Sequence, residues 1–351
     1  MNTLKDLPVA VSLSYFSASG GDGPTGSPYD VLLDSARLGD QAGLEAVWLP
    51  ERHFADFGYL YPNPSVPAAA VAAATSRIGI RAGSVVMPLH HPARVAEEWA
   101  VVDQISRGRV GVSFASGWNG SDFVLSSADV SERRQVMRDG IEAVRALWRG
   151  ESRTFHDASD RPIELRTFPR PVQPELPAWL TAGGSVGTFE AAGSMGLNVL
   201  THLVGQSPED LRENVAAYRE ARRAHGDDGR GHVTLMLHTH LIDGSRASAE
   251  RAQHELARYL TSSMKLDERN VADAERAAAF RSLNDADRAA IAALGASRFL
   301  EFGLICTADE VRDRLTEVRA WDVDEVACLI DFGFEYGPIM KSLEELLSVL
   351  S

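Results

Sequence analysis

Eight short apolar runs alternate with eight amphipathic segments along this chain of 351 residues. The apolar runs have the length and the content of branched and aromatic residues expected of β-strands, and they span 9–15, 45–50, 78–86, 109–115, 177–182, 197–202, 233–241 and 324–331. The amphipathic segments have helical spacing and span 28–43, 64–76, 91–106, 129–149, 185–195, 207–225, 245–262 and 307–320. Because one helix follows each strand, this order predicts an α/β fold, a (β/α)8 barrel of the TIM type.

Two further stretches do not belong to the minimal barrel. Residues 151–176 are expected to form a short hairpin and then a proline-bounded extended segment. Residues 263–304 show helical spacing around 271–293 and form an insertion between the seventh and eighth helices, of the kind that folds over a barrel mouth or contacts a partner. A closing helix is expected at about 336–350. Since no linker or internal repeat is visible, residues 1–351 are expected to form one domain.

The composition excludes several function classes. With 44% hydrophobic and 24% charged residues and no apolar run near the roughly 20 residues of a membrane span, a globular protein is expected. The N-terminus lacks the pattern of a signal peptide, so a cytoplasmic location is expected. A net charge of −14 without a basic block argues against nucleic acid as a partner. Neither the two cysteines, Cys306 and Cys328, nor the histidines have metal-ligand spacing, so no metal site is expected.

In such a barrel the ligand site lies where the strands end, because only residues at the carboxyl ends of the strands converge. The clearest candidate is the glycine-rich turn TAGGSVGTFEAAG, between the fifth strand and its helix. Free N–H groups at a helix start favour a phosphate, and small residues leave room for one. An ordinary turn capped by a serine explains the same residues equally well. The residues of this candidate cofactor site are Ala182, Gly183, Gly184, Ser185, Val186, Gly187 and Thr188.

Several motifs resemble the luciferase-like flavin monooxygenases, most closely the subgroup found beside or within natural-product assembly lines. They are WLPERHF, GSVVMP, DQISRGR, FASGW and TAGGSVGTFEAAGSMGLNVLTHLVGQ. The resemblance runs from about residue 9 to about residue 262 and resumes near 321–333. It implies a monooxygenase that uses O2 and takes reduced FMN as a cosubstrate, with the FMN phosphate held at Gly184, Ser185 and Thr188.

The resemblance also implies partners and a substrate class. A separate flavin reductase would supply reduced FMN, and the substrate would be a small organic molecule or a group tethered to a carrier protein in nonribosomal peptide or polyketide biosynthesis. A homodimer is expected through the helices at 64–76 and 91–106. Docking of an acidic carrier protein would need arginines, although solvated helix faces also explain the arginines present. The candidates are Arg133, Arg134 and Arg138 on one helix and Arg219, Arg222 and Arg223 on another.

Two strand ends carry further cofactor candidates. Gly83 and Ser84 end the third strand, where the family has a non-proline cis peptide bond beneath the flavin ring; a glycine that only avoids crowding is the alternative. The fourth strand ends in Ser116, Gly117 and Trp118, where family members with a strong phosphate clamp can carry an arginine. Because Ser116 offers only one neutral hydrogen bond, looser flavin binding is expected. Trp118 either forms part of the pocket wall or fills the barrel rim.

The catalytic candidates lie in the motif PERHF after the second strand. Glu51 and His53 lie on the same face if the strand pattern continues. In family members that read EHHF, the first histidine is tied to proton transfer, whereas this chain has Arg52 there and keeps His53. Arg52 is therefore expected to stabilise an anionic flavin or substrate, and His53 to act as acid or base. A purely structural, hydrogen-bonded His53 is the alternative.

Barrel geometry selects two more residues. His202 ends the sixth strand and Asp331 the eighth, so both reach the mouth, and His202 is a candidate to bind the cofactor. His238 lies earlier in its strand and is expected in the core or the wall. Two other functions stay open. One is a deazaflavin-dependent oxidoreductase of the same fold. The other is a non-catalytic flavin-binding subunit, which would be consistent with Arg52 in place of the family's histidine and with Ser116 in place of an arginine.

Overall fold

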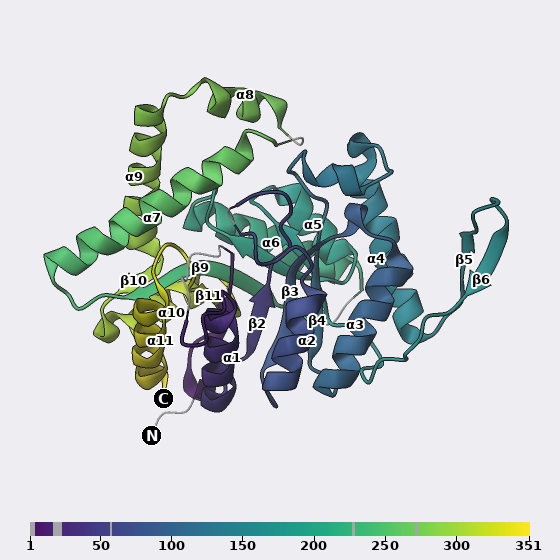
Figure 1. Ribbon diagram of the computed structural model, residues 1–351, viewed down its shortest axis with the longest axis horizontal. Helices are drawn as coiled ribbons and strands as arrows, with labels where there is room; N and C mark the ends of the chain where they lie inside the picture. The colour runs from purple at the N-terminus through teal and green to yellow at the C-terminus, as the bar shows by residue number, and fades with distance from the viewer. Residues whose placement is uncertain (1–3, 17–22, 57, 227–228, 271–272) are drawn as a thin grey trace.

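The eight predicted strands form a closed parallel barrel (Figure 1). The computed structural model describes residues 4–16, 23–56, 58–226, 229–270 and 273–351. The strands pair in the order β1, β2, β3, β4, β7, β8, β9 and β11, and β11 pairs with β1 to close the ring, which confirms the predicted TIM barrel. The strands span β1 Ala10–Ser14, β2 Ala46–Leu49, β3 Gly79–Val86, β4 Val110–Ala115, β7 Ala178–Ala182, β8 Asn198–His202, β9 Val233–Leu241 and β11 Glu325–Leu329.

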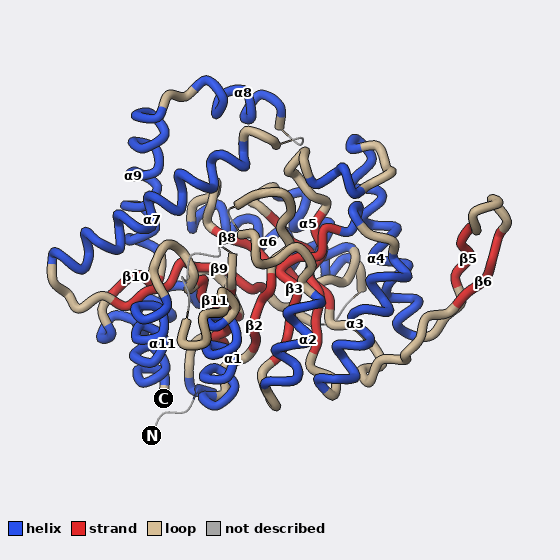
Figure 2. Tube along the Cα trace, viewed as in Figure 1, coloured by secondary structure: helices blue, strands red, loops and turns tan. Residues whose placement is uncertain are grey.

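Helices follow the strands and surround the barrel (Figure 2). Their starts carry the expected signals: Ser207 and Asp210 form a capping box with Pro208 at the first helical position of α6. The helices of the barrel and its closing helix span α1 Asp30–Ala42, α2 Ser65–Ala74, α3 Pro92–Ser106, α4 Arg133–Arg149, α5 Val186–Ser194, α6 Pro208–Ala224, α7 Arg246–Asp267, α10 Val311–Ala320 and α11 Tyr336–Leu350. Short 3-10 helices span η1 Leu4–Asp6, η2 Met87–Leu89, η3 Asp122–Leu125, η4 Val130–Glu132 and η5 Ala308–Glu310.

Large side chains fill the middle of the barrel. Trp48 and Trp179 meet edge to face with ring centroids 5.2 Å apart, and Leu200 and Ala327 are buried with them. Residues two apart on a strand share a face, so the next inward residue after Trp179 is Thr181, one step nearer the mouth. The aromatic layer therefore closes the barrel below its carboxyl end.

A buried carboxylate ties the strands together at the amino-terminal end. Glu325 accepts hydrogen bonds from Ser12 Oγ at 2.6 Å, Trp48 Nε1 at 2.9 Å, Arg81 at 2.6 Å and His232 Nε2 at 2.8 Å. Burial alone would raise the pKa of Glu325, but the charge of Arg81 and the contact with His232 lower it well below its usual range. This network joins residues that lie on, or just before, five strands. It leaves the opposite end of the barrel for the ligand site.

The two additional stretches form separate elements. Strands β5 Arg153–His156 and β6 Pro162–Leu165 make the predicted antiparallel hairpin, which projects away from the barrel (Figure 1). The second stretch forms two helices, α8 Ala274–Ser282 and α9 Asp285–Phe302, where one helical region was predicted; residues 271–272 lie outside the described part. The break follows from Asn284, whose side chain accepts the Asp287 N–H and starts α9. A short strand that was not predicted, β10 Leu304–Cys306, pairs with the end of β9.

The insertion lies over the barrel mouth, where α7, α8 and α9 form an arch (Figure 1). The Gly120 N–H donates to the Arg269 carbonyl at 2.6 Å, and Asn119 and Asn270 form an antiparallel bridge. These contacts join the loop after β4 to the end of α7. Within the part of the chain that the structure describes, no helix combines the length and apolar character required to traverse a bilayer.

Candidate active site

Small polar side chains line the barrel just above the aromatic layer. Thr181 Oγ1 lies 2.6 Å from Ser84 Oγ and 2.7 Å from Ser113 Oγ, so three neighbouring strands share one chain of hydroxyl groups. The Gly83–Ser84 peptide bond is cis, as the family resemblance implied. These side chains are small, and Thr181 lies two residues beyond Trp179 of the aromatic layer.

The start of α5 has the features of an anion site. Ser185 occupies the N-cap position, but its side chain makes no capping hydrogen bond, so the interpretation of an ordinary serine cap does not hold. The Ser185 carbonyl accepts the Thr188 N–H at 2.9 Å, which forms the first turn. Ser185, Val186 and Gly187 are exposed, and a Cβ placed on Gly187 would meet no heavy atom within 4 Å. Exposed N–H groups and open space at a helix start suit a phosphate group.

Two residues that the sequence analysis did not single out fix this turn. Gln206 Nε2 donates to Thr201 Oγ1 at 3.0 Å and to the His202 carbonyl at 2.6 Å. Asn214 Nδ2 donates to Gln206 Oε1 at 3.0 Å and to the Gly184 carbonyl at 3.2 Å. Gly184 has a φ of +104°, which L side chains rarely adopt. The signal available in the sequence was Gln206 itself, at the end of the long motif after the fifth strand.

His202 lies beside the glycines of this turn. A Cβ on Gly183 would lie 3.8 Å from His202 Nε2. The Val204 N–H donates to His202 Nδ1 at 3.2 Å, so the neutral ring carries its proton on Nε2. Burial lowers the pKa of His202 to about 4, which keeps the ring neutral near pH 7. His202 is therefore a neutral hydrogen-bond donor at the mouth.

His238 is placed in the barrel wall, as expected. Its ring is surrounded by Tyr259, Phe299 and Phe332, with centroids 5.0, 4.8 and 5.2 Å away. Burial lowers the pKa of His238 to about 3, and within the described residues its Nε2 has no hydrogen-bond partner. Phe299 belongs to α9, so the aromatic cluster also joins the insertion to the barrel.

Glu51 is the centre of the PERHF motif. Its fully buried carboxylate accepts hydrogen bonds from His53 Nε2 at 2.8 Å, His90 Nε2 at 2.6 Å and the Val86 N–H at 2.7 Å. Burial alone would raise the pKa of Glu51, but these hydrogen bonds and the charge of His90 outweigh it and lower the pKa. Burial would likewise lower the pKa of His90, but Glu51 raises it. His90 was not among the residues predicted for the site, and only the fold brings it to Glu51.

Arg52 lies on the other side of the same loop. Its guanidinium carbon is 3.8 Å from the centroid of the Phe16 ring, and a Cβ on Gly58 would overlap its side chain at 2.6 Å. Burial lowers the pKa of Arg52 to about 10, while the charges of Asp122, Asp331 and Tyr259 oppose that change. Arg52 stays protonated at neutral pH and provides a buried positive charge at the mouth. Asp331 also orders this region by accepting the Phe16 N–H at 2.9 Å.

The loop after β4 crosses the mouth beside these groups. Gly117 has a φ of +76°, and a Cβ there would lie 2.8 Å from Val86 Cγ1. Ser116 and Trp118 are half-buried at the rim. Four residues further on, Asp122 begins η3 and lies within electrostatic reach of Glu51, Arg52 and His53. Asp122 was not among the residues predicted for the site.

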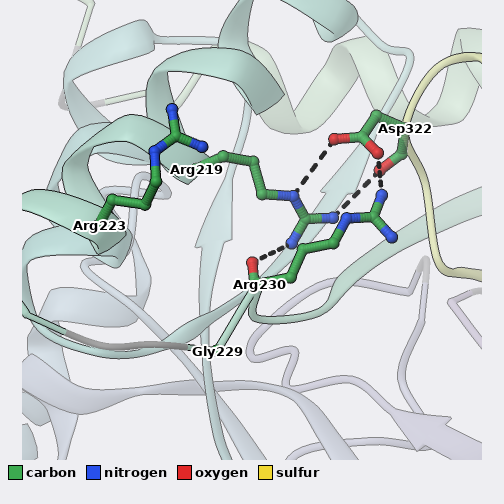
Figure 3. Close-up of a pocket in the computed structure, with 5 residues that line it drawn as sticks. All are labelled: Arg219, Arg223, Gly229, Arg230 and Asp322. Atoms are coloured by element: carbon green, nitrogen blue, oxygen red, sulfur yellow. Dashed lines mark hydrogen bonds and ion pairs between the residues drawn. The ribbon is translucent and has the colours of Figure 1, made fainter.

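A pocket lies at the opposite, amino-terminal face (Figure 3). It contains Arg219, whose guanidinium bonds to Asp324 at 2.6 Å and to Asp322 at 3.3 Å. Arg230 pairs with the same two aspartates. These pairs connect α6 to the segment just before β11, so the Arg219 side chain is held in an ion-pair network at this face. Among the described residues, no group of three or more His, Cys, Asp or Glu side chains is placed to hold a metal ion.

Comparisons with known proteins find a family model and relatives that match most of the chain. A family model described as luciferase-like monooxygenase matches residues 9–325. The oxygenase component of the flavin-dependent trigonelline monooxygenase of Acinetobacter baylyi is 27% identical over 326 residues, which cover 91% of this chain and 88% of that protein.

Solved structures share the barrel. Monooxygenase RslO1 from Streptomyces bottropensis is 22% identical, with a TM-score of 0.76 over 97% of this chain and 98% of that one. An F420-dependent secondary alcohol dehydrogenase is 14% identical, with a TM-score of 0.71 over 97% of this chain and 98% of that one. Likeness at these identities shows the fold alone, since one barrel hosts different chemistries.

Proposed function

Because this chain belongs to the luciferase-like monooxygenase family, we propose that it is the oxygenase component of a two-component system that uses reduced FMN and O2. The observation that supports a phosphate-bearing flavin such as FMN is the start of α5. There the Ser185 side chain caps no backbone group, the exposed N–H groups face open space at Gly187, and Gln206 and Asn214 hold the turn in place. This arrangement matches the phosphate of FMN.

Bound reduced FMN would supply the two electrons that activate O2, so that one oxygen atom enters the substrate and the other leaves as water. Gly184, Ser185 and Thr188 would hold its phosphate, with the remaining residues of 182–188 lining the turn. The hydroxyl chain of Ser84 and Thr181 would lie under the ring. Ser116, Gly117 and Trp118 would border it at the rim.

The residues after β2 would handle charge and protons. Arg52 would stabilise negative charge on the flavin or the substrate, because it is a buried cation. His53 donates its Nε2 proton to Glu51, so in the neutral ring Nδ1 is the nitrogen that can accept a proton. His202 would donate from Nε2 to an acceptor on the cofactor. The arch formed by α7, α8 and α9 would exclude water from this space.

The substrate and partners belong to the same proposal. The substrate is a small organic molecule or a carrier-protein-tethered intermediate of natural-product biosynthesis, and a separate reductase supplies reduced FMN. For carrier docking we favour the arginines on α4 over those on α6, because α4 begins at the mouth whereas Arg219 lies at the other end. We also infer a cytoplasmic location, because the reductants that regenerate reduced FMN are produced there.

We infer one domain for residues 1–351 and a homodimer formed through α2 and α3. Three apolar side chains on these neighbouring helices are exposed: Val66 at 68%, Val101 at 42% and Ile105 at 45%. Two small residues of α2, Ala68 and Ala72, are buried and are not available for this contact. The dimer contact would therefore rest on these exposed apolar side chains and not on those alanines.

The function is tested by isotope labelling. Candidate substrates are incubated with the protein, reduced FMN and 18O2, and the products are analysed by mass spectrometry. Incorporation of one 18O atom is expected. The likeness to an F420-dependent dehydrogenase makes a deazaflavin-dependent oxidoreductase the second candidate. Two results together would favour that candidate: turnover with a deazaflavin in the absence of O2, and no 18O in the product when reduced FMN and 18O2 are supplied. Binding of reduced FMN without accelerated oxidation of flavin or substrate would instead indicate a non-catalytic subunit.

A further inference from the structure

Two carboxyl groups at the mouth have opposite surroundings. Glu51 is fully buried and accepts three hydrogen bonds. Asp122 is half-buried, and its side chain accepts one side-chain hydrogen bond, from Asn119 Nδ2 to Oδ1 at 2.7 Å. Among the residues that the structure describes, its second oxygen has no hydrogen-bond or ion-pair partner. Glu51 is thus held as a carboxylate, whereas Asp122 can accept and release a proton with little rearrangement.

The loop that carries Asp122 is fixed on both sides. The Asp122 N–H donates to the Asn119 carbonyl at 3.2 Å, and Asn119 itself is buried. The neighbouring Gly120 N–H donates to the Arg269 carbonyl, which pins the loop beneath the insertion. Asp122 therefore keeps one position at the edge of the mouth, partly open to solvent. A group in that position can exchange protons with water while the centre of the mouth is covered.

The charges around Asp122 fit this task. Burial raises the pKa of Asp122 to about 6, while the charges of His53 and Arg52 oppose the rise and the charge of Glu51 adds to it. The pKa of Glu51 moves in the other direction, below its usual value. When the environments of two acids in one site push their pKa values apart, the two acids commonly have different roles. One stays ionised, and the other exchanges a proton near the working pH.

We propose that Asp122 is a proton-transfer residue of this site, while ionised Glu51 orients His53 and His90. The inference rests on the proposed function. Each oxygenation consumes two electrons and two protons as one atom of O2 becomes water. When Asp122 donates, its O–H bond breaks, the proton goes to the departing oxygen, and the carboxylate left behind takes a proton from solvent. No further reductant or oxidant is needed, because reduced FMN supplies the electrons.

The first test measures the titration in the flavin-free protein. The raised pKa of Asp122 means that its contribution to stability is fully present below about pH 4 and is lost as pH rises through about 6. Asp122→Asn removes the titrating group at nearly constant volume. The Tm of this variant minus the Tm of the wild type should therefore increase as the pH rises from 4.5 to 7.5. Glu132→Gln, an exposed change on the same loop, should show no such gain.

The second test uses reduced FMN as the probe in air-saturated buffer. The rate of FMN re-oxidation by the wild type should fall as pH rises through about 6, because the protonated acid is the donor. Asp122→Asn should be slower by about tenfold or more at pH 5.5 and nearly independent of pH. Asp122→Glu should restore a pH transition. Affinity for FMN should change little in either variant.

The outcomes separate the two proposals. A wild-type transition that persists in Asp122→Asn, or identical Tm profiles for the two proteins, would overturn the role of Asp122 and leave the flavin assignment standing. A wild type that neither binds reduced FMN nor changes its oxidation at any pH would overturn the proposed function, and the proton-transfer role with it, even if the Tm profiles differed.

Discussion

Ser185 gives the most direct residue-scale test of the flavin assignment. Ser185→Asp places a negative charge where the phosphate is proposed to bind, and like charges at close range repel. The dissociation constant for FMN should rise by about tenfold or more, equivalent to ~1.4 kcal/mol, in a fluorescence titration. Ser194→Asp, at the exposed end of the same helix, is the matched control and should leave the affinity nearly unchanged. Equal affinities for wild type and Ser185→Asp would remove the phosphate from this turn.

His53 separates binding from chemistry at the same scale. His53→Ala removes the ring that Glu51 orients, so re-oxidation of reduced FMN should slow by about a hundredfold. FMN affinity should change by less than about threefold, because His53 is proposed to act on protons and not on the phosphate. His156→Ala on the exposed hairpin strand β5 is the control. If His53→Ala kept wild-type rates, the histidine would be structural, which is the alternative that the sequence left open.

At the scale of elements, the loop after β4 depends on Gly117. Gly117→Ala forces a side chain into a left-handed conformation and against Val86, so it should destabilise the protein by about 1–3 kcal/mol in urea unfolding. Gly337→Ala in α11, where φ is not left-handed and no heavy atom lies within 4 Å of the new Cβ, should be neutral or slightly stabilising. A stable Gly117→Ala variant would mean that this loop can move away from the mouth.

The insertion shows what helical periodicity predicts at this scale and what it does not. The spacing around 271–293 predicted helix, and helix is present on both sides of Leu283 and Asn284. The break between α8 and α9 depends on a local cap, and the position of the arch depends on backbone contacts with the loop after β4. Periodicity reports which face of a helix is apolar but not which distant loop will cover that face.

For the whole molecule, the dimer proposal makes a simple prediction. Val101→Arg places a charge at one of the exposed apolar positions of the proposed contact. The dissociation constant of the dimer should rise by at least about tenfold, because a buried, unpaired charge opposes association, as measured by light scattering during size-exclusion chromatography. Leu294→Arg, on the exposed side of α9, should leave the dimer intact. A monomeric wild type, or a dimer unaffected by Val101→Arg, would contradict the proposed contact.

The barrel itself was predictable from the sequence, because each segment by itself shows either the apolar pattern of a strand or the amphipathic pattern of a helix. The same holds for the strand ends: convergence at the carboxyl edge follows from the fold class, so Glu51, Arg52, His53, Ser185 and His202 could be named in advance. The short strand β10 could not, since three residues carry too little pattern and its pairing with β9 is set by packing.

The tertiary structure alone decided the charge state and the partners of the site. His90 meets Glu51 across 39 positions of sequence, and Asp122, on the loop after β4, lies within electrostatic reach of the residues after β2. Whether a carboxyl group is held ionised or can exchange a proton depends on its burial and hydrogen bonds, and these come from segments far apart in the chain. The sequence by itself determined the barrel, the position of its mouth and the residue types available there. Folding determined which of them touch, because a side chain's environment is a property of its neighbours in space.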